Sequence, residues 1–340
     1  MEQRIPLIGM NPQQLQQVAA QCGMPRFAAG QMARWLYEKR VTGIDAMTDL
    51  SKSARERLAL AYCVGRESPL DRVESADGTA KYLFRGVEAR DVEAVMIPDR
   101  DRATLCISSQ AGCRMNCTFC MTGRQGFHGN LTTAQIVNQI LSVDESRGLT
   151  NAVFMGMGEP MDNYEAVAQA IEVMTAPWGL AWSPKRITVS TIGKTDTLRR
   201  LLDETQVHIA ISVHSPFPSE RIGLMPVERA YPLTSVFELL RGYDWRHQRR
   251  LSVEYTMWEG VNTDMRHAEA LARLLRGMEC RVNLIRFHAI PGCDLRTADA
   301  RTMNAFRERL NELGVTATIR ASRGEDIMAA CGMLAGKKKI

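Results

Sequence analysis

The stretch Cys113-Arg-Met-Asn-Cys117-Thr-Phe-Cys120, set within LCISSQAGCRMNCTFCMTGRQGF at residues 105–127, places three cysteines within eight residues. Three thiolates so close together can hold an iron-sulfur cluster, which normally takes four cysteine ligands. A cluster held by only three would keep one iron open, and an open iron can bind a substrate. The spacing therefore favours a reactive iron-sulfur site.

A structural zinc site is the alternative for the same cysteines. His128 would supply the fourth ligand, since three thiolates and one imidazole also complete a tetrahedral zinc shell. A disulfide framework fits less well, because the chain has nine cysteines and no apolar signal segment. We expect a reducing, cytoplasmic setting.

The length and composition of the chain allow it to bury a full hydrophobic core and to form one large and one small domain. It has 340 residues, of which 45% are hydrophobic and 24% are charged. The formal net charge of +5 suits a polyanionic partner, although many ordinary enzymes share it. No apolar run approaches the length that spans a membrane, so we expect no membrane partner.

Residues 1–62 are predicted to form a small helical module. Asn11 and Pro12 start a helix that Gly23 ends, and further helices are expected over about 27–39 and 51–61. The module would be an accessory domain that contacts RNA. The basic side chains that could reach phosphates are Lys39, Arg40, Lys52, Arg55 and Arg57.

Residues 63–103 read as a short antiparallel β lead-in, with a turn at Ser75–Gly78 between β-type runs. Glu93 lies in an alternating strand and shares a face with Val95 and Ile97. On an apolar face its carboxyl would have a raised pKa and act as a base. The pattern alone favours an exposed glutamate on an edge strand.

Residues 104–325 alternate strand-like and helix-like segments, which predicts an α/β fold with a parallel sheet. The strands are expected at about 104–109, 151–156, 186–191, 207–213, 251–256 and 281–287. No nucleotide-binding glycine fingerprint follows the first strand, so a partial (β/α)6 barrel is preferred to a doubly wound sheet.

Polar residues cluster at the predicted carboxyl ends of these strands, where such barrels carry their chemistry. They are Gly156 to Pro160 (GMGEP), Ser190 and Thr191, Ser212 to His214, and His288. Each could also be a capping or turn residue. The remaining residues, 326–340, form a C-terminal segment in which Cys331 precedes Gly332 on a predicted loop, where a thiol is open to chemistry.

Taken together, the motifs resemble the RlmN/Cfr family of radical S-adenosylmethionine (SAM) rRNA adenine methyltransferases, over nearly the whole chain. The likeness lies in LCISSQAGC, CRMNCTFC, GMGEP, the ISVH segment and RGEDIMAACGMLAG. It implies a radical SAM barrel with a [4Fe-4S] cluster on Cys113, Cys117 and Cys120. It also implies methylation of C2 of adenine at position 2503 of 23S rRNA, and of adenosine 37 in some tRNAs.

The resemblance also assigns roles to single residues. Cys331 matches the cysteine that one SAM methylates and that a second SAM activates through a 5'-deoxyadenosyl radical, so two SAM are used per turnover. Cys106 matches the thiol that resolves the protein-RNA adduct by forming a disulfide, and Glu93 matches the proton acceptor. The matching SAM contacts are Gly158, Glu159, Ser190, Ser212, Val213 and His214, together with His288, which replaces the family's asparagine.

The partners implied are 23S rRNA, tRNA and an electron donor such as flavodoxin, with the protein acting as a monomer. Cfr-like methylation at C8 of the same adenine is the nearest alternative. A more distant alternative is a non-catalytic RNA-binding protein in which a metal only stabilises the fold. This alternative predicts that Cys106 and Cys331 are dispensable.

Overall fold

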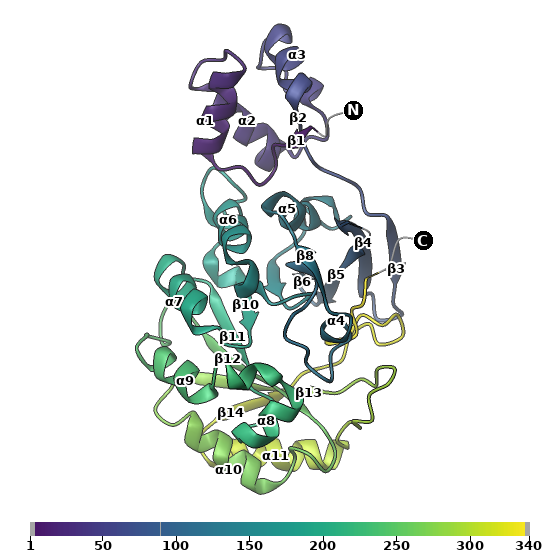
Figure 1. Ribbon diagram of the computed structural model, residues 1–340, viewed down its shortest axis with the longest axis vertical. Coiled ribbons are helices and arrows are strands. Elements are labelled where there is room, and N and C mark those ends of the chain that lie inside the picture. The colour runs from purple at the N-terminus through teal and green to yellow at the C-terminus, as the bar shows by residue number, and fades with distance from the viewer. Residues whose placement is uncertain (1–3, 89, 337–340) are drawn as a thin grey trace.

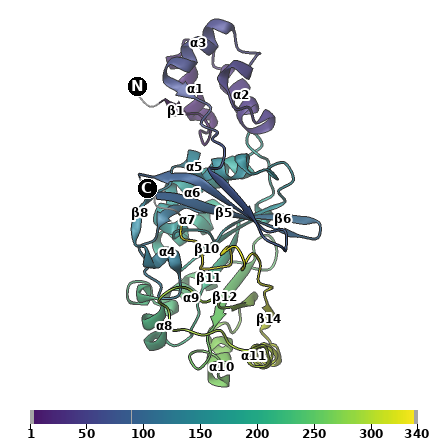
Figure 2. The same ribbon diagram turned by 90° about the vertical axis from the view of Figure 1, so that its right-hand side faces the viewer.

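The architecture is an open sheet of ten strands with helices on its outer side, topped by a small helical module (Figures 1 and 2). The computed structural model describes residues 4–88 and 90–336. The strand order is β14-β13-β12-β11-β10-β9-β6-β5-β4-β3, and all pairs from β6 to β14 are parallel. The parallel strands are β6 (Arg102–Cys106), β9 (Asn151–Phe154), β10 (Ile187–Thr191), β11 (His208–Ser212), β12 (Leu251–Met257), β13 (Cys280–Arg286) and β14 (Thr316–Ile319).

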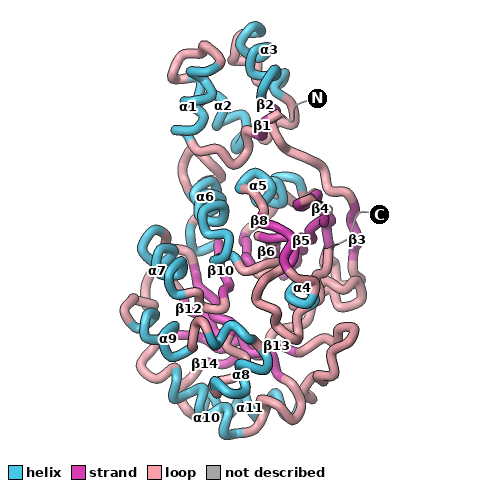
Figure 3. The backbone as a smooth tube through the Cα atoms, in the orientation of Figure 1, coloured by secondary structure: helices cyan, strands magenta, loops and turns pink. Residues whose placement is uncertain are grey.

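Helices connect these parallel strands (Figure 3). Each of them buries one apolar face against the sheet. The first of them begins at a capping box, in which Thr132 and Gln135 exchange side-chain and backbone hydrogen bonds, as the sequence predicts. The helices are α5 (Thr133–Ser142), α6 (Tyr164–Thr175), α7 (Thr195–Glu204), α9 (Leu233–Arg241), α10 (Met265–Leu274) and α11 (Ala300–Glu312), while α8 (Pro218–Leu224) lies in the loop after β11.

The partial βα barrel expected from the sequence is confirmed, with one addition. All six predicted parallel strands are present within a few residues of their expected bounds. A seventh, β14, follows α11 and pairs with β13 at the edge of the sheet. Its residues TATI alternate between exposed and more buried, and so short an edge strand gives a weak sequence pattern.

The antiparallel lead-in is present but belongs to the same sheet. Its strands are β3 (Asp71–Glu74), β4 (Ala80–Val87) and β5 (Arg90–Asp99), and β5 pairs antiparallel with β6. The expectation of an exposed edge position for Glu93 is therefore wrong. Glu93 lies on an interior strand and is only 6% exposed. It pairs with Leu83 of β4, and its carboxylate accepts the N–H groups of the C-terminal residues Ala335 and Gly336.

The N-terminal module has the three predicted helical regions. It comprises β1 (Ile5–Pro6), α1 (Pro12–Gln21), α2 (Ala28–Ala33), a π-helix (Arg34–Lys39), a 3-10 turn (Ile44–Ala46), α3 (Lys52–Ala61) and β2 (Tyr62–Cys63). Three of the five basic residues proposed for RNA contact hydrogen-bond to protein oxygens, namely Arg40, Arg55 and Arg57. No helix of residues 4–88 and 90–336 is long and apolar enough to cross a bilayer.

Candidate active site

The three-cysteine motif lies in a loop, residues 113–126, that a short pair of strands closes at its base. β7 (Gln110–Gly112) pairs antiparallel with β8 (Phe127–Asn130). Gly112 has φ +74°, and a Cβ there would come within 1.9 Å of the Gly126 carbonyl oxygen. The Cys113 N–H donates to that same oxygen at 3.0 Å. Only glycine allows the two ends of this cysteine loop to approach so closely.

The cysteine loop keeps its thiols out of water. Cys113 and Cys117 are buried and Cys120 is half-buried. Burial raises the pKa of Cys113 to about 12, and it also raises the pKa values of Cys117 and Cys120. Buried thiolates need a compensating positive charge, and the iron of a cluster supplies one. These residues therefore fit a [4Fe-4S] cluster.

The zinc alternative does not fit the geometry. In the described part of the chain no three His, Cys, Asp or Glu side chains are close enough together to ligate one metal ion. His128 lies on β8, where its Nε2 is 3.1 Å from the Gln125 carbonyl oxygen. A tetrahedral zinc needs all four ligand atoms about 2.0–2.3 Å from one centre. A cluster spreads its three thiolates over separate irons and does not need that convergence.

The GMGEP turn after β9 packs against the base of the cysteine loop. Gly158 has φ +96°, and a Cβ there would lie 2.5 Å from the Gln110 Cβ. Gln110 also accepts the Glu159 N–H at 2.8 Å. The buried Glu159 carboxylate accepts from the Thr191 hydroxyl at 2.5 Å and the Ile192 N–H at 3.0 Å. Burial raises the pKa of Glu159 to about 7, although these bonds favour the charged form.

The end of β11 presents His214 in a left-handed conformation, with φ +59°. Its Nδ1 accepts the Thr256 N–H at 3.0 Å, so the neutral ring carries its proton on Nε2. Burial, and then the nearby charge of Arg221, lower the pKa of His214 to about 3. The ring packs edge-on against Phe119 of the cysteine loop, with centroids 4.9 Å apart. His214 is thus a neutral hydrogen-bond donor beside the proposed cluster.

Arg221 of α8 fixes the same strand end, although no sequence signal pointed to it. Its guanidinium donates to the carbonyl oxygens of Ser212 at 2.9 Å and Val213 at 3.1 Å. Arg221 is fully buried and pairs with the buried carboxylate of Glu228. The desolvation penalty of a buried ion pair offsets much of the attraction between its charges. The main effect of Arg221 here is therefore to position the strand end.

Cys331 lies on the predicted C-terminal segment, residues 326–340, of which 337–340 lie outside the described residues. Hydrogen bonds tie the described part of this segment to the cysteine loop. The Gly332 carbonyl accepts the Met121 N–H at 2.8 Å, and the Leu334 carbonyl accepts the Thr122 hydroxyl at 2.7 Å. The side chain of Cys331 is exposed, whereas Ala330 and Met333 on either side are buried. The fold therefore presents this thiol from an anchored loop.

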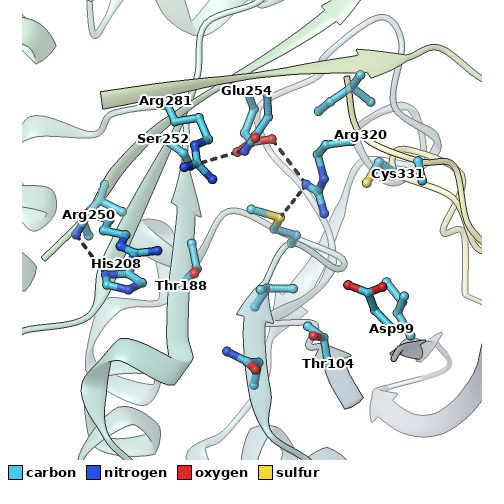
Figure 4. Close-up of a pocket in the computed structure, with 18 of the residues that line it drawn as sticks. Asp99, Thr104, Thr188, His208, Arg250, Ser252, Glu254, Arg281, Arg320 and Cys331 are labelled. Carbon is cyan, nitrogen blue, oxygen red and sulfur yellow. Dashed lines mark hydrogen bonds and ion pairs between the residues drawn. The ribbon is translucent and has the colours of Figure 1, made fainter. Parts of the chain in front are cut away.

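Two adjoining cavities meet at Cys331. The smaller, about 200 Å3, lies under the cysteine loop. The larger, about 830 Å3, opens beside it and is rich in arginine (Figure 4). Most of the sequence-predicted site residues line the smaller cavity: Cys106, Cys113, Cys117, Cys120, Gly158, Glu159, Ser190, Ser212, His214 and Cys331. Cys331 lines both.

Arg320 and Glu254 also line both cavities, although neither was predicted from the sequence to belong to the site. Arg320 donates to Glu254 at 3.4 Å and approaches the Met155 sulfur at 3.7 Å. Figure 4 shows its guanidinium beside Cys331. Burial by itself lowers the pKa of Arg320, but negative charge at Cys331 and Glu254 raises it overall. Arg320 directly follows β14, and because that short strand has a weak sequence pattern, no sequence signal pointed to Arg320.

Three predicted residues lie elsewhere. Val213 is fully buried and does not line either cavity. His288 lines only the larger cavity, where its ring nitrogens lie 3.0 Å from the Ser322 hydroxyl and 3.2 Å from the Glu325 carboxylate. Glu93 lines neither cavity.

Comparison with known proteins agrees with this arrangement. Residues 107–275 match the Radical SAM superfamily, and residues 5–64 match the ribosomal RNA large subunit methyltransferase N-terminal domain. A Porphyromonas gingivalis protein named "Probable dual-specificity RNA methyltransferase RlmN" is 55% identical over 337 residues, which cover 99% of this chain and 96% of the relative. This chain belongs to the RlmN family.

Further similarities to the RlmN family extend to another relative and to a solved structure. A Bacteroides fragilis protein of the same name is 54% identical over 99% of this chain and 98% of its own length. The crystal structure of a radical SAM methyltransferase from Sphaerobacter thermophilus has a TM-score of 0.91 and 38% identity, covering 97% of this chain and 99% of that one. Membership in the radical SAM superfamily implies a [4Fe-4S] cluster and the use of SAM.

Proposed function

We propose that this protein methylates C2 of adenine in RNA, with adenine 2503 of 23S rRNA as a substrate and adenosine 37 of some tRNAs as a second one. The observation that carries the proposal is the position of Cys331, which lines both the small cavity under the cysteine loop and the large arginine-rich cavity. A thiol shared by two cavities can take a methyl group on one side and deliver it on the other.

The small cavity is the proposed site of SAM. Cys113, Cys117 and Cys120 would hold the cluster, which when bound supplies an electron that cleaves SAM to a 5'-deoxyadenosyl radical. Glycine, hydroxyl and imidazole groups would orient the methionine and ribose ends by hydrogen bonds. We assign this role to Gly158, Glu159, Ser190, Ser212 and His214, all of which line the cavity.

Cys331 is the proposed methyl carrier. Its thiolate attacks the methyl carbon of one SAM, so a sulfur–carbon bond forms on the protein, the bond from that carbon to the sulfonium sulfur breaks, and S-adenosylhomocysteine leaves. In the second half-reaction the 5'-deoxyadenosyl radical takes a hydrogen atom from the S-methyl group and leaves as 5'-deoxyadenosine, and the methylene carbon bonds to C2 of adenine. The adduct must then lose the C2 proton and one electron, and that electron would return to the cluster when it is bound. This route suits C2 because that carbon has no nucleophilic lone pair for direct displacement. Its exposed side chain makes Cys331 accessible to both reactants.

Cys106 is the proposed resolving thiol, at the end of β6 in the same small cavity. As a thiolate it attacks the sulfur of Cys331 and forms a Cys106–Cys331 disulfide. The bond from that sulfur to the RNA-bound carbon breaks, and the carbon keeps the bonding electrons and takes up a proton to become the methyl group. Burial raises the pKa of Cys106 to about 12, so the thiol needs a base before it can attack. Arg320 is close enough to stabilise the thiolate once it forms.

Glu93 is the assigned proton acceptor by resemblance, but its contacts favour a supporting role. One oxygen accepts the N–H groups of Ala335 and Gly336 at 2.9 and 3.0 Å, and the other lies 3.1 Å from the Lys81 amine. A carboxylate engaged in this way holds the C-terminal segment in place. We therefore assign Glu93 to positioning Cys331 and leave removal of the C2 proton to a thiolate.

The large cavity is the proposed entrance for the adenine, which must leave its stack to be reached. Arg250, Arg281 and Arg320 supply positive charge there, which suits a nucleic acid. Residues 1–62 would act as the RNA-contacting accessory domain and residues 326–340 as the carrier of the reactive cysteine. A flavodoxin-type donor would deliver the electrons, and the protein would act as a monomer.

The proposal is tested by mass spectrometry of nucleosides from unmodified 23S rRNA incubated with anaerobically reconstituted protein, SAM and a reductant. Formation of 2-methyladenosine is the expected result. Formation of 8-methyladenosine would assign Cfr-like chemistry instead. If SAM is cleaved to 5'-deoxyadenosine while neither product forms, the assignment of 23S rRNA as substrate is wrong.

A further inference from the structure

Three arginines meet where the N-terminal module joins the barrel, far from the cysteine loop in sequence. Arg40 follows the π-helix, Arg66 lies in the linker after β2, and Arg147 follows α5. Figures 1 and 2 show this junction above the ends of α5 and α6. Three separate parts of the chain thus contribute one positive side chain each.

The three guanidinium groups donate hydrogen bonds only to neutral carbonyl and hydroxyl oxygens of the described residues. Arg40 donates to the carbonyl and hydroxyl oxygens of Ser146, both at 2.8 Å. Arg66 donates to the Arg40 carbonyl at 2.6 Å and to the Ser142 hydroxyl at 3.3 Å, and Arg147 donates to the Lys39 carbonyl at 3.2 Å. Two hydrogen bonds each therefore hold the guanidinium groups of Arg40 and Arg66, and one holds that of Arg147.

Their positive charges have no carboxylate partner among residues 4–88 and 90–336. None of the three takes part in an ion pair there, and Glu67, next to Arg66, pairs with Arg85 instead. Burial first, and then the charges of Arg147 and Arg66, lower the pKa of Arg40, and burial with Arg147 lowers that of Arg66. The arginines therefore repel each other without internal compensation, and a bound anion would relieve the repulsion.

A groove of about 1040 Å3, lined by two of the three arginines but not by Arg66, runs between the N-terminal module and the loop after α6. Arg40 and Arg147 line one part of it, and Arg26 adds a further exposed positive charge. Two aromatic side chains also line it: Trp178, which is half-buried, and Phe27, which is 70% exposed. Positive charge beside accessible rings is the surface chemistry that binds a flexible nucleic-acid strand.

We propose that Arg40, Arg66 and Arg147 form a phosphodiester-binding site that grips the RNA substrate away from the methylated base. The inference rests on the proposed function, because it takes RNA as the ligand. Guanidinium groups match phosphate oxygens in geometry and charge, and the neighbouring rings suit unpaired bases. Binding across the linker would fix the N-terminal module against the barrel, because the three side chains come from both parts and from the linker.

The test measures affinity for a fluorescent 23S rRNA transcript by anisotropy at salt concentrations between roughly 50 and 200 mM. Arg66→Gln/Arg147→Gln should weaken binding, and the slope of log K against log salt should become shallower by about one per lost guanidinium. Arg241→Gln is the matched control, since its exposed side chain also donates only to a neutral carbonyl, that of Leu274, at 2.7 Å. Arg66→Lys/Arg147→Lys should restore most of the slope.

The kinetic constants and the melting temperature of each variant are measured in parallel. At saturating RNA the double variant should keep the wild-type kcat, and only its KM should rise. If its melting temperature falls, Arg147→Gln alone replaces it, because that exposed side chain makes a single bond to the Lys39 carbonyl. A salt slope equal to that of Arg241→Gln, while the wild type still binds and methylates the RNA, would overturn this site and leave the proposed function intact. A wild type that does not bind RNA would overturn both.

Discussion

The Glu93 carboxylate accepts the backbone N–H of Ala335 at 2.9 Å, just beyond Cys331 in the chain. The same oxygen accepts the Gly336 N–H, and Lys81 neutralises the other oxygen at 3.1 Å. A strand of the lead-in thus holds the segment that carries the proposed methyl carrier. The position of Cys331 depends on this contact as well as on the cysteine loop.

Replacing Glu93 should therefore impair methylation of Cys331 before any RNA is involved. Glu93→Ala removes both hydrogen bonds, each worth about 1.5–3 kcal/mol when the acceptor is charged, so methylation should slow by roughly tenfold or more. Glu93→Gln, which keeps an acceptor, should be intermediate. Peptide mass spectrometry of S-methylcysteine follows the rate, with Glu67→Gln as a surface control. Normal methylation followed by accumulation of a protein-RNA adduct in Glu93→Gln would instead identify Glu93 as the base.

The two reactive cysteines should have opposite phenotypes. Cys106→Ala should leave a covalent protein-RNA adduct, because the bond between the Cys331 sulfur and the RNA-bound carbon then lacks its attacking thiol. Cys331→Ala should give neither adduct nor product. Denaturing gels with labelled RNA separate these results, and Cys63→Ala, in the N-terminal module, should behave as wild type. An active Cys331→Ala enzyme would end the carrier hypothesis.

Gly112→Ala should reduce cluster loading. The added Cβ would lie 1.9 Å from the Gly126 oxygen at a φ of +74°, so the base of the cysteine loop must open, at a cost of about 1–3 kcal/mol. We expect severalfold less iron and sulfide per protein after anaerobic reconstitution. Gly223→Ala is the control, because an added Cβ there meets no atom within 4 Å. Equal iron in both variants would show that the closed base is not needed.

His214 should make stability depend on pH in the acid range. Its folded pKa of about 3 lies below the ordinary value of 6.5, so the unfolded chain gains a proton that the folded protein does not. Stability is complete above about pH 6.5 and falls as the pH drops toward 3, by at most about 1.4 kcal/mol per pH unit. Urea unfolding at several pH values gives the free energy of unfolding at each pH. This free energy should change less with pH for His214→Gln than for the wild type. His247→Gln, which replaces an exposed ring, should keep the wild-type dependence of the unfolding free energy on pH.

The local patterns of the sequence determined much of the fold. Strong runs such as LSVEYTM at β12 and the capping box at Thr132 gave strands and helices, because alternation and capping act over a few residues. The cysteine spacing and the GMGEP turn determined the kind of chemistry, since a cluster loop needs its ligands close together in the chain. The short edge strand β14 had too little pattern to be seen.

Only the tertiary structure decided which distant residues meet. Glu93 looked like an exposed strand residue, but sheet pairing and the C-terminal segment bury it. Arg221 and Arg320 carried no signal, because their roles depend on strand ends and thiols far away in the chain. The arginines of the domain junction come together only when linker, module and barrel pack. Sequence periodicity reports each element's own environment, whereas these contacts depend on how the elements are placed relative to one another.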